Sequence, residues 1–158
     1  MKRLTLFGVT VLTVGLTTLG VAASGQNRTA ETRDLKLAAQ CGERMLKGTY
    51  GVTLSGLRPG AGGALEQFVG VSMQTYDGKG NFTQTDNTHG PSASAIDQAG
   101  WGTYTVNADC SGTKTLWVDG LPFPIENRIV VLDTGAEIRI VVMSPAQIVV
   151  SAQGRRIF

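Results

Sequence analysis

From Gly48 onward, apolar and polar residues alternate with a period of two, which is typical of β-strands that bury one face. The alternation predicts strands at 49–55, 66–76, 82–86, 101–106, 113–118, 125–132, 137–143 and 147–153. Most of these segments are separated only by turn-sized gaps, which favours antiparallel pairing of consecutive strands. The sequence therefore predicts an all-β fold: a single antiparallel, mostly up-and-down barrel of about eight strands, with a short N-terminal helix.

Residues suited to tight turns separate the segments. Asp77 to Asn81 reads Asp-Gly-Lys-Gly-Asn and carries the strongest turn signal, because glycine supplies the positive φ that hairpins need. The same residues resemble a calcium loop, but the bidentate acid that completes such a loop is missing, which favours the hairpin. Residues 57–63 and 89–98 are predicted to be loops, the second because Pro91 opposes regular pairing.

The first 23 residues have the pattern of a secretory signal peptide. Basic residues precede an apolar stretch from Leu4 to Leu19, and small residues follow as far as Ala23. A retained membrane anchor is the alternative, which the Gly and Thr content disfavours. The pattern predicts a cleaved Sec-type signal peptide at 1–23 and a secreted or periplasmic protein.

Residues 24–40 are predicted to form a flexible segment and the start of a short helix, ahead of a barrel domain at 41–158. The helical spacing runs from Asp34 to Leu46, with Gly42 limiting its length.

The chain contains two cysteines, Cys41 and Cys110, which in an exported protein predict one disulfide. A reactive or metal-binding thiol pair is the alternative. It is disfavoured because there is no Cys-x-x-Cys spacing and the chain has a single histidine.

Charge gives little indication of a nucleic-acid or membrane partner. The chain has 14 basic and 12 acidic residues, and the predicted signal peptide contains two of the basic ones, Lys2 and Arg3. The mature chain is therefore balanced, without the clustered Lys and Arg that nucleic acids and anionic membranes require. We expect no nucleic-acid partner, and no membrane partner after cleavage of the signal.

Aromatic residues occur in most of the predicted strands, and in a barrel about half of them would point inward. The residues expected to line a ligand site are Tyr50, Phe68, Tyr76 and Tyr104. Packing of a solid core is the alternative for the same residues. Trp101 and Trp117 share the parity of threonines expected on the outer face, so they indicate either an interface or a lumen of mixed polarity.

No motif predicts catalysis, a bound metal or a cofactor. His89 is the only imidazole and is expected to be a solvated loop residue, with a general base or metal ligand as the alternative. Asp86, Asp97 and Glu126 are isolated carboxylates, for which a solvated position is expected. No residue is therefore assigned a catalytic role.

Two stretches of the chain echo each other. Gly48-Thr49-Tyr50-Gly51 follows Cys41, and Gly102-Thr103-Tyr104-Thr105 leads to Cys110, with the turn at 77–81 between them. In this pattern the chain resembles a family of small exported bacterial proteins of uncharacterised function. More distantly it is similar to the calycin and allene-oxide-cyclase-like barrels. That likeness implies an interior able to hold a small apolar molecule, but no catalytic motif of those enzymes is present.

Three functions remain as hypotheses. The first is binding of a small apolar or amphipathic ligand inside the barrel. The second is a non-catalytic structural protein that forms a homo-oligomer through its C-terminal strands, where apolar runs occur at 129–132 and 140–143. The third is an enzyme of the cyclase or isomerase type, which a buried carboxylate with a raised pKa in a pocket would favour.

Overall fold

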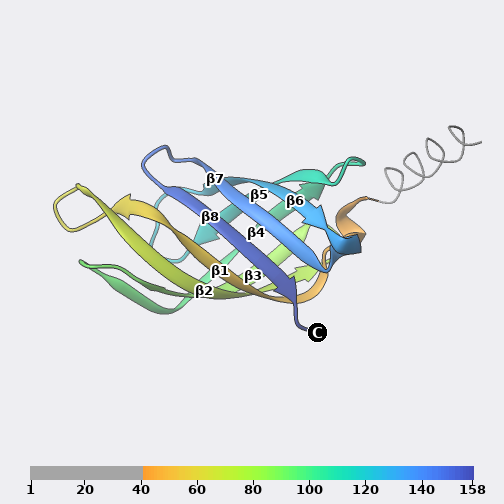
Figure 1. Ribbon diagram of the computed structural model, residues 1–158, viewed down its shortest axis with the longest axis horizontal. Helices are drawn as coiled ribbons and strands as arrows, with labels where there is room; N and C mark the ends of the chain where they lie inside the picture. The colour runs from red at the N-terminus through yellow and green to blue at the C-terminus, as the bar shows by residue number, and fades with distance from the viewer. Residues whose placement is uncertain (1–40) are drawn as a thin grey trace, which may run out of the picture.

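The computed structural model describes residues 41–158, which form a closed antiparallel barrel (Figure 1). The strands are β1 (Lys47–Pro59), β2 (Leu65–Asp77), β3 (Asn81–His89), β4 (Ser94–Val106), β5 (Ser111–Val118), β6 (Ile125–Leu132), β7 (Glu137–Ser144) and β8 (Val149–Arg156). Each strand pairs with the next, and β8 closes the barrel by pairing with β1. The predicted up-and-down barrel of eight strands is confirmed.

Several strands are longer than predicted, and the loop expected at 89–98 is wrong. β3 continues to His89 and β4 begins at Ser94, so that only residues 90–93 around Pro91 connect them. The pairing of β3 with β4 changes register between Asp86 and Thr88, and on β4 Asp97 adopts a positive φ of 51° at this irregularity. A bulge of this kind lets pairing continue past a segment whose sequence lacks strict alternation.

The predicted signal peptide at 1–23 and the segment at 24–40 lie outside the described residues, as does the first part of the predicted helix. In place of the rest of that helix, a short 3₁₀ turn, η1 (Glu43–Met45), follows an extended Gly42. In the part of the chain that the structure describes, no helix is long and apolar enough to cross a membrane.

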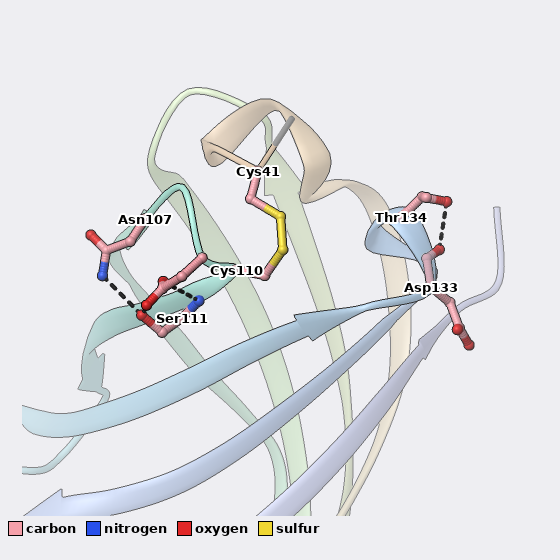
Figure 2. Close-up of a disulfide and its surroundings, with 7 residues drawn as sticks. Cys41, Asn107, Cys110, Ser111, Asp133 and Thr134 are labelled. Atoms are coloured by element: carbon pink, nitrogen blue, oxygen red, sulfur yellow. Dashed lines mark hydrogen bonds between the residues drawn. A yellow bond between two sulfur atoms is a disulfide. The ribbon is translucent and has the colours of Figure 1, made fainter. Parts of the chain in front are cut away.

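One end of the barrel, which we call the closed end, is covered by η1. Leu46 directly after it is completely buried, and the hydroxyl of Tyr104 donates to the carbonyl oxygens of Glu43 and Leu46, both at 2.9 Å. Figure 2 shows the disulfide at this end, which joins Cys41 to Cys110 in the turn between β4 and β5. The predicted disulfide is therefore present, and it links the segment before β1 to the turn between β4 and β5.

Beneath η1, four aromatic side chains fill the barrel. We call this set the aromatic layer: Tyr50, Tyr76, Phe82 and Tyr104. The Tyr76 ring packs edge-on against Tyr50 and Tyr104 at centroid distances of 5.3 and 5.2 Å, and it stacks on Phe82 at 5.5 Å. All four residues are at most 3% exposed, so this part of the barrel is a solid core.

The outer face combines threonines with exposed apolar side chains. Trp101 and Trp117 lie opposite each other on β4 and β5, and they are 50% and 41% exposed, so they point outward and do not line a lumen. In the C-terminal strands, Val130, Val141 and Met143 are also exposed. The homo-oligomer expected through these strands stays a prediction.

Candidate functional site

The barrel contains a cavity of about 480 Å³ at the end opposite the disulfide. We call this the open end; four connections surround it, at 60–64, 90–93, 119–124 and 145–148. This volume lies within the range of small-molecule sites in proteins. The barrel is therefore solid at its closed end and hollow at its open end.

The walls of the cavity are mainly apolar. On the strands, inward positions alternate with outward ones, so Leu116 and Val118 face the cavity while Trp117 between them faces solvent. The remaining apolar wall residues are Leu54, Pro59, Phe68, Ala93, Ala95, Leu121, Phe123, Ile125, Ile140, Val142, Ile148, Val150 and Ala152. A surface of this kind favours apolar ligands, because binding removes apolar area of both ligand and wall from contact with water.

Polar side chains form the bottom of the cavity, where it meets the aromatic layer. We call them the polar floor: Gln74, Gln84, Asp86, Lys114 and Asn127. Each is at most 8% exposed, and they come from β2, β3, β5 and β6. Such residues are rarely buried unless they are hydrogen-bonded, and here most of their polar atoms have partners.

Lys114 is the cation of the polar floor and is only 2% exposed. Its Nζ donates to Gln74 Oε1 at 2.8 Å and to Gln84 Oε1 at 3.4 Å. It also lies 4.0 Å from the centre of the Phe82 ring and 5.6 Å from that of Tyr76. Burial lowers the pKa of Lys114 to about 7, against a smaller opposing effect of the Asp86 charge.

Asp86 is the carboxylate of the polar floor. Gln84 Nε2 donates to its Oδ2 at 2.5 Å, so Gln84 bridges Asp86 and Lys114. Burial raises the pKa of Asp86, and the hydrogen bond from Gln84 and the charge of Lys114 offset part of this rise. Asp86 Oδ1 and the nearby Ser72 Oγ are buried without a hydrogen-bond partner among the described residues. The floor therefore retains unused hydrogen-bonding capacity.

A second charged group lies nearer the mouth of the cavity. Arg58 Nε pairs with Glu66 Oε1 at 3.1 Å, and the guanidinium lies 4.8 Å from the centre of the Phe68 ring. Hydrogen bonds from Ser92 and from Arg58 lower the pKa of Glu66. Arg58 is therefore held by protein partners at the rim.

The structure separates the four residues that were predicted to line a ligand site. All of them point into the barrel and are buried. Phe68 lines the cavity, whereas Tyr50, Tyr76 and Tyr104 belong to the aromatic layer below its floor. The contact of these residues with a ligand stays a prediction.

Of the isolated acids, Asp86 is the one that lines the cavity. Glu126 accepts a hydrogen bond from Thr115 on the outer side of the barrel, and Asp97 is exposed at the β3–β4 irregularity. His89 is an exposed residue at the end of β3, where its Nδ1 lies 2.8 Å from Ser94 Oγ. Within residues 41–158, no group of three His, Cys, Asp or Glu side chains could hold a metal ion.

Lys114 and its glutamine partners were not predicted from the sequence. Lys114 occupies the same strand parity as Leu116 and Val118, opposite to the threonines that were expected on the outer face. A lysine at an inward position was therefore visible in the pattern. Its position at a cavity floor was not visible, because that depends on residues from three other strands.

No family model matches this chain, and no match is found among the curated proteins or the solved structures. The resemblance to exported bacterial proteins and to calycin-like barrels therefore remains an expectation, while the barrel itself is observed.

Proposed function

We propose that this protein binds a small apolar or amphipathic molecule inside its barrel. The observation that carries the proposal is the cavity of about 480 Å³, with apolar walls and a hydrogen-bonding floor. Apolar walls contribute free energy in proportion to the ligand area that they bury, and a few polar groups fix its orientation. An amphipathic ligand would place its polar end at the floor.

We further propose that binding takes place outside the cytoplasm, in the periplasm or after secretion. The disulfide between Cys41 and Cys110 is compatible with an oxidising compartment. The expected signal peptide at 1–23 supports the same location. Mass spectrometry of the protein from its host would test both, because cleavage and a formed disulfide each change the measured mass.

Two adjacent residues allow a matched test of binding. Val150 lines the cavity, whereas Val149 is 55% exposed on the outer face. The test titrates Nile red, an apolar fluorophore, into the wild type, Val150→Trp and Val149→Trp. We expect fluorescence enhancement with the wild type and with Val149→Trp. Val150→Trp should weaken binding at least about tenfold, because the indole occupies the ligand volume.

The comparison is valid only for folded variants, so the circular dichroism spectrum of each is recorded first. If Val150→Trp fails to fold, Ala152→Trp replaces it, since Ala152 lines the same cavity. Equal Nile red binding by the cavity variant and the surface variant would rule out the barrel interior as the binding site.

An enzyme of the cyclase or isomerase type is the second candidate, and Asp86 favours it. This buried carboxylate lines the cavity, and its raised pKa suits general acid–base chemistry. The test takes a compound that displaces Nile red, incubates it with the protein, and compares the recovered compound with the starting material. Conversion to an isomer by the wild type but not by Asp86→Asn would favour the enzyme. Unchanged recovery from both would favour binding alone.

A further inference from the structure

We propose that Lys114 forms a reversible imine with an apolar aldehyde held in the cavity. This inference rests on the proposed ligand binding, and it names a chemical class of ligand together with the atom that captures it. It follows from three observations: the position of the amine, the kind of partners that hold it, and its charge environment.

The position of the amine is the first observation. Lys114 lies at the boundary between the solid aromatic layer and the hollow part of the barrel, and it lines the cavity. An aldehyde that entered from the open end with its carbonyl group first would reach this floor while its chain contacted the apolar walls. The amine is therefore placed where the polar end of an amphipathic ligand would stop.

The hydrogen-bond partners of the amine are the second observation. Nζ is held by two amide oxygens, from Gln74 and Gln84, and by the ring face of Phe82. Among the described residues, Lys114 forms no ion pair with a carboxylate. An amide oxygen accepts a hydrogen bond from a neutral amine as well as from an ammonium group, so these partners hold the side chain without requiring its proton.

The charge environment is the third observation. The titratable side chains that face Lys114 are Asp86 on β3, Tyr76 on β2 and Tyr104, its register partner on β4. Burial raises the pKa of both tyrosines, so they are neutral near pH 7, and Asp86 is the one group in this set that can carry charge. Because burial lowers its pKa to about 7, Lys114 is neutral, and therefore nucleophilic, far more often near neutral pH than an exposed lysine is.

The reaction needs no further reactant. The lone pair of Nζ attacks the carbonyl carbon to form a C–N bond, and a proton moves from nitrogen to oxygen to give a carbinolamine. The C–O bond then breaks, a second proton leaves nitrogen, and the oxygen departs as water, which leaves a C=N bond. If the imine gains a proton, the carboxylate of Asp86 supplies the opposite charge. Gln84, which donates to Asp86, lies between the two groups.

The test incubates the full protein with decanal and sodium cyanoborohydride near pH 7, which reduces any imine to a stable secondary amine. Peptide mapping by mass spectrometry then locates the decyl group. Exposed Lys47 and Lys79 serve as internal controls. We expect modification of Lys114 to exceed that of either control at least about tenfold, because an ordinary exposed lysine has a pKa of about 10.4 and is almost fully protonated at this pH.

Two variants and a competitor separate the outcomes. Lys114→Arg and Val150→Trp should each abolish the adduct at position 114 and leave labelling of Lys47 unchanged. Decanol, which has no carbonyl group, should compete with decanal and also displace Nile red. Displacement of Nile red by decanol without any adduct at Lys114 would overturn this inference and leave the proposed function standing. If no adduct forms at Lys114 and Nile red binds Val150→Trp as well as Val149→Trp, both the inference and the proposed function fail. The wild-type peptide map decides the inference even if a variant does not fold.

Discussion

The amine of Lys114 lies 4.0 Å from the centre of the Phe82 ring. This contact joins the floor of the cavity to the aromatic core, and a cation over a ring face gains about 0.5–2 kcal/mol in other proteins. The ring face and two glutamine oxygens replace only part of the hydration that the amine loses on burial. Lys114 therefore links the stability of the fold to pH.

We expect the free energy of unfolding to rise with pH above neutrality. Burial lowers the pKa of Lys114 from about 10.5 to about 7, so between these values the unfolded chain binds more protons than the folded one. Stability is lowest below the folded pKa and increases as pH rises through this window. One proton contributes about 1.4 kcal/mol per pH unit.

Urea unfolding of the wild type and of Lys114→Met, at several pH values between about 7.5 and 9.5, measures this effect. The variant should lack most of the rise, because methionine does not titrate. Parallel pH profiles for the two proteins would mean that the amine is not protonated more readily in the unfolded chain.

Tyr104→Phe should destabilise the closed end by about 1 kcal/mol. The substitution removes the hydroxyl that donates to the carbonyl oxygens of Glu43 and Leu46, and it keeps the ring that packs on Tyr76. Thr105→Ala is the matched control, because Thr105 is on the exposed face of β4, where its hydroxyl forms a hydrogen bond with that of Thr113 on β5. The control should change stability by a few tenths of a kcal/mol at most. Thermal unfolding of both variants compares them directly.

Loss of the disulfide should lower stability by about 4 kcal/mol on the chain-entropy model, since 69 residues separate the two cysteines. The double variant Cys41→Ser, Cys110→Ser is compared with the wild type in urea, with and without a reducing agent. The reducing agent should destabilise the wild type and have no effect on the double variant. An equal response of both would show that the reductant acts elsewhere.

Gly102→Ala should be strongly destabilising, by about 1–3 kcal/mol, because a Cβ at this position would overlap the carbonyl oxygen of Thr115 on β5 and crowd the Phe82 ring. The backbones of β4 and β5 approach closely here, and the aromatic layer leaves no room for adjustment. Gly42→Ala is the control: its backbone is extended and a Cβ there meets no atom within 4 Å. Similar unfolding midpoints for the two variants would contradict the close approach.

The alternation of the chain was sufficient to predict the barrel because each strand obeys it locally. Tyr50 and Val52 face inward while Thr49 and Thr53 face outward, and the hairpin from Asp77 to Asn81 needs only its own residues. Asp77 Oδ1 accepts hydrogen bonds from the backbone nitrogens of Lys79 and Asn81, as expected for a turn of this composition. The disulfide was predictable from the count of two cysteines together with the export pattern at the start of the chain.

The division of the interior into a solid end and a hollow end was not predictable in the same way. Tyr76 and Phe68 are both inward aromatic residues of β2, yet one is in the core and the other lines the cavity. The two residues differ in their position along the barrel axis. That position depends on the register of every strand pair, and only one end of the barrel is covered by η1. Lys114 and Asp86 likewise become neighbours of one floor only when the barrel closes.

The segment that covers the closed end, held by the disulfide, would limit the length of ligand that the cavity can enclose. Since η1, Leu46 and the aromatic layer block one end, a chain-like molecule can advance only as far as the polar floor. Each added methylene would strengthen binding by about 0.8 kcal/mol while it still contacts the apolar walls. Beyond the mouth, further methylenes would extend into water and add nothing. The distance from Lys114 to the open rim would then set the ligand length at which affinity in a homologous series stops rising.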